Sequence, residues 1–200
     1  MSQAAATQRP ELTLPEAEAH ALRTAYEDAA VILEYGSGGS TVMAAELPGK
    51  TVFAVESDKA WAEDMRAWFD ANPPAEGTEV HVVWSDIGLT KEWGQPRDDS
   101  EWRRWSRYPL GIWRDKGFRQ PDVVLVDGRF RVGCALASAF LTQAPLTLLF
   151  DDYADRPRYA RVEDWLGPPS MIGRMAVFHV EPTPISPDRL LQVVQFMHRP

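Results

Sequence analysis

Short apolar runs alternate with stretches of helical periodicity along this chain. The runs that are rich in β-branched and aliphatic residues, and therefore strand-like, cover residues 31–35, 51–55, 78–86, 122–127 and 146–150. Helical spacing or capping residues mark 13–30, 41–47, 58–72, 131–143 and 156–166. Strands that alternate with helices predict a mainly parallel sheet with right-handed crossovers.

The two ends of the chain depart from this alternation. Residues 1–10 show no such pattern and are predicted to be disordered, which leaves 11–200 as one domain. Near the other end, residues 175–180 and 190–197 look strand-like and are separated by a proline-rich loop. Because no helix lies between them, we predict that these two runs pair antiparallel.

Two of the predicted helices carry additional signals. Thr13 is the predicted N-cap of the first helix, since its hydroxyl can accept a hydrogen bond from the first turn. In the helix over 58–72, aromatic and apolar side chains recur at helical spacing and are expected to face the core. These side chains are Trp61, Met65, Trp68 and Phe69.

A glycine-rich turn follows the first predicted strand. Residues 31–40 read Val-Ile-Leu-Glu-Tyr-Gly-Ser-Gly-Gly-Ser, which predicts a strand, a tight turn and a helix start. Gly36, Gly38 and Gly39 have no Cβ, so they can take positive φ and let a nucleotide-like ligand approach the backbone. Glu34 near the end of the strand indicates a polar role.

A second acid follows at the interval that a nucleotide site requires. Glu56 ends the next strand, twenty residues after Gly36, where a carboxylate can accept both hydroxyls of a ribose. The dinucleotide pattern wants a third glycine or alanine at residue 41, and this chain has Thr41. We therefore expect an adenosine ligand without phosphates rather than a dinucleotide.

At these residues the chain resembles the class I S-adenosylmethionine-dependent methyltransferases, whose first motif reads acid-x-Gly-x-Gly-x-Gly. Residues 34–40 match this motif with Ser40 in place of the last glycine, and the resemblance spans about residues 30–199. It implies a three-layer Rossmann-like α/β fold: a mainly parallel seven-stranded sheet with an antiparallel C-terminal hairpin. It also implies S-adenosyl-L-methionine as the cofactor.

The resemblance assigns roles to the acids at the strand ends. Glu34 and the glycine turn would face the methionine portion, Glu56 the ribose, and Asp86 with Ile87 the adenine. The predicted cofactor-binding residues are Glu34, Gly36, Ser37, Gly38, Gly39, Ser40, Glu56, Ser57, Asp86 and Ile87. Alternatively, some of these acids only cap the helices that follow them, which is plausible for Asp58.

The fourth and fifth strands also end in acids. The family places catalytic or substrate-contacting residues after the fourth strand, where Asp127 is the catalytic candidate and Arg129 and Arg131 are substrate candidates. Asp127 with Asp151 and Asp152 also resembles the three side chains that hold a divalent ion in metal-dependent O-methyltransferases. Oxygen ligands suit Mg²⁺, which favours the acceptor as its alkoxide.

The metal-dependent pattern is not matched in full. Asp152 stands where those enzymes often have Asn, and no lysine that could serve as their general base lies near Asp127. The alternative is that Asp127 contacts the substrate directly, while Asp151 and Asp152 cap the next helix. An insertion at about 91–120 holds four tryptophans among arginines such as Arg103, and it forms either a lid over the acceptor or a small core.

The composition of the chain limits the classes of partner that we expect. The formal charge of −8 argues against nucleic acid as a partner, and no apolar stretch approaches the length of a membrane span. The single cysteine, Cys134, lies in a small-residue helical run, where a buried inert thiol is expected and a reducing cytoplasm fits. The sequence does not reveal the oligomeric state.

These patterns together predict an S-adenosylmethionine-dependent methyltransferase that acts on oxygen of a small-molecule or carbohydrate-like acceptor. Two alternatives remain open at this point. One is a binding protein that keeps the fold and no longer catalyses, which Ser40 and the missing lysine allow. The other is a nicotinamide-dependent oxidoreductase, which Thr41 disfavours.

Overall fold

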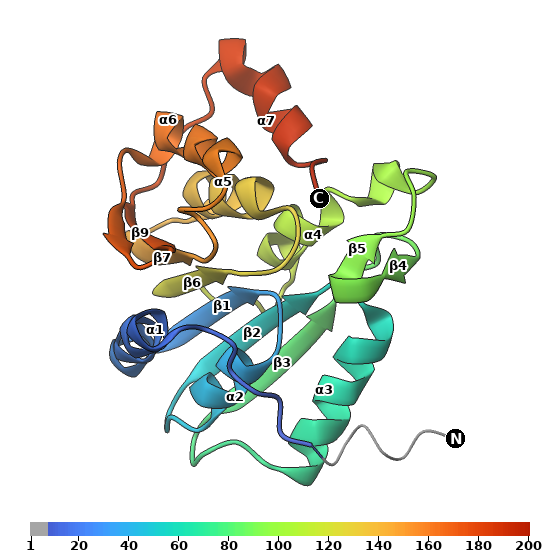
Figure 1. Ribbon diagram of the computed structural model, residues 1–200, viewed down its shortest axis with the longest axis vertical. Helices are drawn as coiled ribbons and strands as arrows, with labels where there is room; N and C mark the ends of the chain where they lie inside the picture. The colour runs from blue at the N-terminus through green and yellow to red at the C-terminus, as the bar shows by residue number, and fades with distance from the viewer. Residues whose placement is uncertain (1–7) are drawn as a thin grey trace.

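The computed structural model describes residues 8–200. Residues 1–7, on which most of the predicted N-terminal disorder falls, lie outside the described part. A seven-stranded sheet runs through the molecule in the order β3-β2-β1-β6-β7-β9-β8 (Figure 1). Its strands are β1 (Val31–Tyr35), β2 (Thr51–Glu56), β3 (Glu79–Trp84), β6 (Val123–Val126), β7 (Leu146–Phe150), β8 (Ser170–Ile172) and β9 (Met175–Val180).

Helices cover both faces of the sheet and make a three-layer molecule (Figure 1). One face carries α1 (Glu16–Asp28), α2 (Gly39–Ala45) and α3 (Lys59–Ala71). The other carries α4 (Arg107–Leu110), α5 (Arg131–Leu141), α6 (Glu163–Leu166) and α7 (Leu190–Phe196). Five strands are parallel, and β9 pairs antiparallel with both β7 and β8. The predicted Rossmann-like α/β fold is confirmed.

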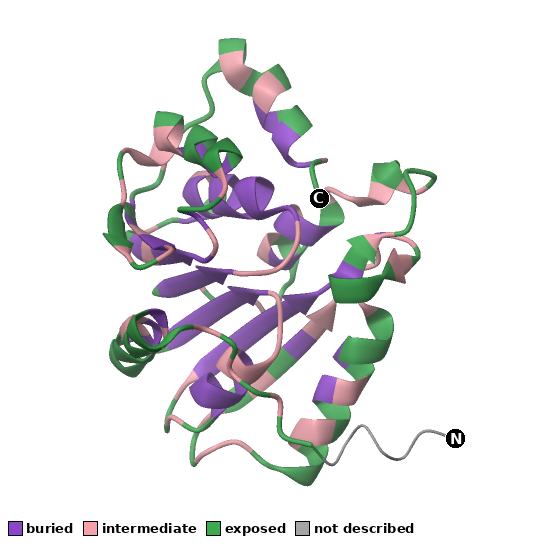
Figure 2. Ribbon diagram, in the orientation of Figure 1, coloured by how far each residue is buried: buried purple, intermediate pink, exposed green. Residues whose placement is uncertain are grey.

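The central strands are apolar because both of their faces are covered. Every residue of β1, β2 and β6 is buried, whereas β3 at the edge is only partly covered (Figure 2). A strand that is buried on both faces reads as a continuous apolar run instead of an alternating one. The two acids inside these strands, Glu34 and Glu56, are therefore exceptions that need polar partners.

The C-terminal hairpin exists, but one of its strands was assigned to the wrong residues. The strand that pairs with β9 is β8, which precedes it through a tight turn at Gly173 (φ +55°). The run over 190–197, predicted as a strand, forms the helix α7 instead. Its buried residues, Val193 and Phe196, are three apart, which is the spacing of a helix face and not of a strand.

Two helix predictions also need correction. The first helix begins at Glu16 after Pro15, and the side chain of Thr13 does not cap it. The helix predicted over 156–166 is split into a 3₁₀ segment at Pro157–Val162 and the short α6. By contrast, the predicted cap at Asp58 is confirmed, since its carboxylate accepts hydrogen bonds from two amides of the first turn of α3.

The aromatic insertion mainly packs against the sheet. It contains a short hairpin of β4 (Thr90–Lys91) and β5 (Gln95–Pro96), α4 and three 3₁₀ turns: Glu92–Gly94, Trp102–Arg104 and Ile112–Arg114. Tyr108 and Ile112 are buried in the core, with Trp105 and Trp113 packed against them. Trp113 also donates a hydrogen bond to the Tyr35 hydroxyl (2.7 Å). These side chains join the main core of the protein and do not form a separate small core within the insertion.

Two smaller sequence observations also have a structural counterpart. None of the helices within residues 8–200 has the length and apolar character needed to cross a membrane. The Cys134 thiol is fully buried on α5, and burial raises its pKa well above the usual value. A buried protonated thiol is a poor nucleophile, as the small-residue context predicted.

Candidate functional site

The glycine turn between β1 and α2 is shaped by close backbone contacts. Gly36 has φ +108°, and a Cβ there would lie 3.0 Å from the backbone nitrogen of Gly128. A Cβ on Gly39 would overlap the backbone of Glu11 and Leu12, because the N-terminal segment crosses over the turn. Above Gly38, in contrast, a Cβ would meet no atom within 4 Å. The turn is thus packed on two sides and open on the third.

Glu34 stabilises the glycine turn through hydrogen bonds of its buried carboxylate. Its carboxylate is fully buried and accepts hydrogen bonds from the Tyr26 hydroxyl (2.6 Å) and the Thr41 hydroxyl (2.5 Å). Burial raises the pKa of Glu34 to about 7, against the opposing effect of hydrogen bonds from Thr41, Tyr26 and Ser40. Glu34 is not among the residues that line the cavity described below, so it supports the turn without facing a ligand directly.

Thr41 explains the departure from the dinucleotide pattern. Its hydroxyl oxygen accepts a hydrogen bond from the backbone N–H of Gly38 (3.0 Å) while it donates to Glu34. The third-glycine position is thereby used to tie the turn to the buried carboxylate. A glycine or alanine at residue 41 has no side-chain hydroxyl and would leave both contacts unmade.

Glu56 lies at the end of β2 and faces the same turn. One carboxylate oxygen accepts from the backbone N–H groups of Ser57 (2.6 Å) and Asp58 (2.9 Å), and the other from the Ser37 hydroxyl (3.1 Å). Burial raises its pKa, and these hydrogen bonds oppose the rise. The Ser57 hydroxyl donates to the carbonyl of Gly94 (2.9 Å), which connects β2 to the aromatic insertion.

One cavity of about 960 Å³ opens above the glycine turn. Its volume is in the range of sites that hold a nucleoside-sized ligand. It brings together residues from four segments that are distant in the sequence: 8–14, the turn 36–40, residues 56–58 with Trp61, and Asp127 to Arg129. Residues Glu92, Trp93, Gly94 and Tyr108 of the insertion complete the lining.

Part of this lining was missed by the sequence analysis. Trp61 was expected in the core, but it is 38% exposed, lines the cavity and donates to the carbonyl of Ser37 (2.9 Å). Trp93 is exposed and has a left-handed backbone (φ 61°), followed by Gly94 (φ 66°). The Trp-Gly pair within an aromatic insertion could have indicated from the sequence that Trp93 is a candidate for the cavity lining. Residues 8–12 carry no helix or strand pattern from which their position could be read, and the helix start predicted at Thr13 gave no indication that this segment lines a cavity.

Asp86 and Ile87, the residues predicted to face the adenine, lie outside the cavity lining. Asp86 accepts a hydrogen bond from the backbone N–H of Gly88 (3.1 Å) and pairs with Arg104 (3.1 Å). Ile87 is buried in the hydrophobic core. The third strand end therefore anchors the insertion in this structure, and a contact of either residue with a ligand stays a prediction.

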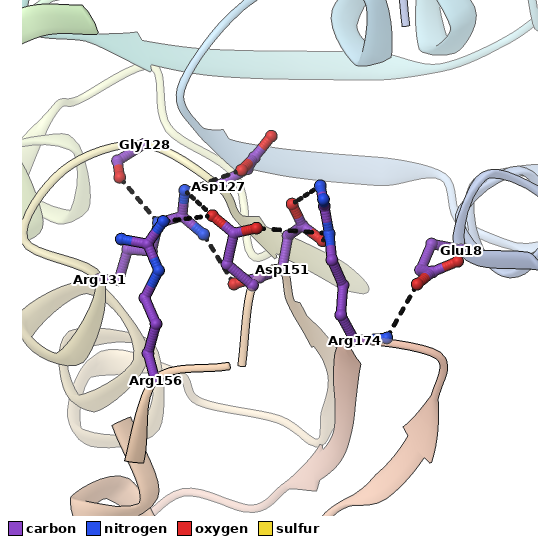
Figure 3. A network of polar contacts seen from close by, with 8 residues as sticks. Glu18, Asp127, Gly128, Arg131, Asp151, Arg156 and Arg174 are labelled. Carbon is purple, nitrogen blue, oxygen red and sulfur yellow. Dashed lines mark hydrogen bonds and ion pairs between the residues drawn. The ribbon is translucent and has the colours of Figure 1, made fainter. Parts of the chain in front are cut away.

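The acids after β6 and β7 form one network with arginines (Figure 3). Arg131 lies in the middle: its guanidinium donates to the carbonyls of Gly128 (3.0 Å) and Asp151 (2.6 Å). The same group pairs with Asp127 (3.1 Å) and Asp152 (3.3 Å). Arg131 was predicted to contact substrate. Its side chain is buried and does not line the cavity, so the structure gives it a positioning role instead.

Two further arginines complete the network. Arg174, from the β8–β9 turn, pairs with both oxygens of the buried Asp151 carboxylate (3.0 and 2.8 Å) and with Asp152 (3.3 Å). Arg156 also pairs with Asp152 (2.9 Å). The backbone N–H of Arg174 donates to Glu18 of α1 (2.8 Å), which fixes the hairpin turn against the first helix (Figure 3).

This network does not fit the predicted metal site. Across residues 8–200, no cluster of His, Cys, Asp or Glu has a geometry that could hold an ion. Both oxygens of Asp151 and both of Asp152 already face guanidinium groups, which offset the carboxylate charge and would repel a divalent cation. The same pairs contradict the simple capping alternative for these two acids. No chemical step is therefore derived through a metal.

Asp127 is the acid of this network that reaches the cavity. One of its oxygens pairs with Arg131, and its half-buried side chain lines the cavity beside Gly128. Burial raises the pKa of Asp127 to about 6; Arg131 opposes the rise, while Asp151 and Asp152 add to it. A carboxylate with a pKa near 6 is ionised at neutral pH and is a stronger base than an ordinary aspartate.

Comparison with known proteins gives this geometry a family context. A crystal structure of a methyltransferase-like protein from Silicibacter pomeroyi matches with a TM-score of 0.94 and 65% sequence identity, over 96% of this chain and 99% of that chain. The O-methyltransferase TomG from Streptomyces achromogenes, solved in complex with SAM, matches with a TM-score of 0.51 and 17% identity, over 84% of this chain and 79% of that chain. The chain matches no protein-family model, and no curated protein matches it either.

Proposed function

Because this chain belongs to the class I S-adenosylmethionine-dependent methyltransferases, we propose that it binds S-adenosylmethionine above the glycine turn and methylates an oxygen of a small-molecule acceptor. One observation carries the proposal. The glycine turn, Glu56 and Asp127 lie far apart in the sequence, yet all of them line one cavity of nucleoside size. A cofactor site and a base are thus available to the same ligands.

The residues around the turn suit the cofactor. The open space above Gly38 admits a ligand against the backbone, and the Glu56 carboxylate is placed to accept the hydroxyls of a ribose. The acids of the lining outnumber its arginines: Glu11, Glu56, Asp58, Glu92 and Asp127 against Arg9 and Arg129. A negative wall favours a ligand that carries a sulfonium and an ammonium group.

Methyl transfer requires two contributions from the protein: it aligns the acceptor with the methyl group, and it accepts one proton. When bound, S-adenosylmethionine supplies a methyl group on a sulfonium, so the S–C bond breaks as the O–C bond forms and a neutral thioether leaves. Asp127 accepts the proton of the acceptor hydroxyl. Arg131 holds one oxygen of Asp127, which directs the other toward the cavity. The proton added to Asp127 then returns to solvent.

Calorimetric titration with S-adenosylhomocysteine tests the cofactor site. We expect micromolar binding by the wild type and about a hundredfold weaker binding by Glu56→Gln, since the hydrogen bonds from ribose to a charged acceptor are weakened. Glu63→Gln, which removes an exposed acid on α3, is the matched control and should bind normally. Added Mg²⁺ should leave the affinity unchanged.

The outcomes separate the proposal from its alternatives. No binding of S-adenosylhomocysteine by the wild type would contradict the cofactor assignment. Binding without transfer of tritium from labelled S-adenosylmethionine to any compound of a cell extract would favour a non-catalytic binding protein. Equal affinity of Glu56→Gln and the wild type would remove Glu56 from the ribose site.

A further inference from the structure

One arginine at the edge of β6 has no acidic partner. The carboxylates Asp127, Asp151 and Asp152 are matched by three arginines that pair with them, Arg131, Arg156 and Arg174. Within the described residues, Arg129 makes no ion pair. It is a fourth cation beside these three anions, and none of the three carboxylates pairs with it.

Arg129 lies where its positive charge faces the cavity. Arg129 lies between Gly128 and Phe130, whose backbone is left-handed (φ 52°), and it is part of the cavity lining. Its Nε is buried and, among the described residues, has no hydrogen-bond partner. Buried donors are nearly always satisfied, so this N–H needs a partner from outside the described residues, and a ligand in the adjacent cavity can provide one.

The electrostatic surroundings agree with a missing anion. Burial and the neighbouring guanidinium groups of Arg131 and Arg156 lower the pKa of Arg129. Guanidinium remains charged even when its pKa is lowered, so the site holds a desolvated cation that other cations repel. An anion bound there would supply hydrogen bonds to the orphaned donor and would relieve that repulsion.

We propose that Arg129 binds an anionic group, of the carboxylate class, that is carried by the methyl acceptor. This inference rests on the proposed function and deepens it by naming a chemical property of the substrate. Asp127 and Arg129 lie two residues apart on the same wall. An acceptor whose hydroxyl contacts Asp127 therefore places a neighbouring carboxylate within reach of Arg129, in the bidentate geometry that guanidinium groups prefer.

A carboxylate could also come from the cofactor, whose methionine portion carries one. The experiment must therefore separate the two sources. We would follow the Nε–H resonance of Arg129 by NMR and titrate protein saturated with S-adenosylhomocysteine with acetate, with acetamide as the neutral control, at constant ionic strength. Acetate is the smallest carboxylate, so the shape of an unknown acceptor does not limit the test.

We expect acetate to shift the resonance in a saturable way and acetamide to leave it unchanged. In calorimetric titrations with acetate, a readout that does not need the Arg129 resonance, Arg129→Gln should bind acetate at least about tenfold more weakly than the wild type, because a charge-assisted hydrogen bond is lost. The matched control is Arg158→Gln, which removes an exposed guanidinium 5.3 Å from the ring of Tyr159, outside the cavity lining. It should bind acetate normally.

Three outcomes would overturn the inference or replace it. Equal responses to acetate and acetamide, or no response to either in both the loaded and the unloaded protein, would exclude an anion site at Arg129. If S-adenosylhomocysteine blocks acetate, and Arg129→Gln weakens S-adenosylhomocysteine but not 5′-methylthioadenosine, the anion is the cofactor's own carboxylate. If S-adenosylhomocysteine does not bind, the proposed function fails, and acetate titration of the unloaded protein still decides whether the anion site exists.

Discussion

Two groups of carboxylates lie at the same edge of the sheet, and they differ in their partners. At the ends of β1 and β2, Glu34 and Glu56 accept hydrogen bonds only from hydroxyl and backbone N–H groups. At the ends of β6 and β7, the carboxylates face guanidinium groups (Figure 3). No guanidinium therefore offsets the carboxylates of the first region among the described residues, whereas those of the second are neutralised.

The difference shows that the number of acids does not set the charge of a site. Neutral donors satisfy the oxygens of a carboxylate but leave its charge in place, which suits a cationic ligand. Arginines offset the charge, and Arg129 adds a cation that forms no ion pair among the described residues. By our two proposals, the same type of strand end binds a cationic cofactor on one side of the cavity and an anionic acceptor on the other.

The largest effect is expected where the two regions meet, at Asp127. Asp127→Asn should slow methyl transfer by about 10²- to 10⁴-fold and leave the affinity for S-adenosylhomocysteine unchanged, because only the base is lost. In the wild type, the carboxyl is protonated at low pH. The rate should therefore rise about tenfold per pH unit below pH about 6 and level off above it.

Single-turnover transfer of tritium from labelled S-adenosylmethionine to a small-molecule extract measures both effects. A rate of Asp127→Asn equal to that of the wild type would remove Asp127 from the mechanism. A flat pH profile between 5 and 7 in the wild type would do the same for its role as a base.

An intermediate effect is expected from breaking a guanidinium pair. Asp151 is buried and bound at both oxygens by Arg174, so Asp151→Asn should lower the free energy of unfolding by about 2–4 kcal/mol. The control is Asp164→Asn, which breaks the more exposed pair with Arg189 and should cost less than about 1 kcal/mol. Urea denaturation compares the two, and equal losses would contradict the importance we give to the buried network.

The last expected effect is a pH dependence of stability that comes from Glu34, in the region where the carboxylates have neutral donors. The pKa of Glu34 is about 7 in the folded protein and about 4.5 when unfolded, so the folded state retains a proton between these values. Its contribution to stability is present below pH about 4.5 and is lost as the pH rises to about 7. The loss over the whole range is of the order of 3 kcal/mol, since the shift spans about 2.5 pKa units and each unit corresponds to about 1.4 kcal/mol.

Glu34→Gln mimics the protonated side chain and should remove this pH dependence, so the variant gains on the wild type as the pH rises from 5 to 8. Unfolding curves at several pH values measure the difference. The exposed Glu46→Gln serves as the control for a general charge effect. A constant difference between Glu34→Gln and the wild type across this range would mean that Glu34 is ionised in the fold.

The fold, the glycine turn and the position of Glu56 follow from local sequence, and the arginine network beside Asp127 does not. Glycines and acids at the ends of apolar runs predict the turn and Glu56 because parallel strands bring their carboxyl ends to one edge. The partners of Asp151 and Asp152 were missed, since Arg174 comes from a hairpin turn 23 residues after Asp151 and no local pattern connects them. A metal was inferred from the acids alone.

The C-terminal error has a similar cause. The run over 190–197 is rich in apolar residues, and a short run of that kind does not by itself distinguish a strand from a helix. Only the packing of Val193 and Phe196 decides for a helix. For Trp61 the helix was predicted correctly, but the side chain was placed wrongly. Its helical spacing predicted a core position, whereas the residue lines the cavity above the turn.

The N-terminal segment has a practical consequence for where this domain is taken to begin. Residues 8–14 form neither helix nor strand, so a boundary drawn by secondary structure would fall at Glu16. A chain shortened to that point would keep every strand and helix of the fold. It would nevertheless lose one wall of the cavity and uncover the turn at Gly39. Such a chain would look complete by its secondary structure, although its cavity would be incomplete and the core would lose the packing of Leu12 and Leu14.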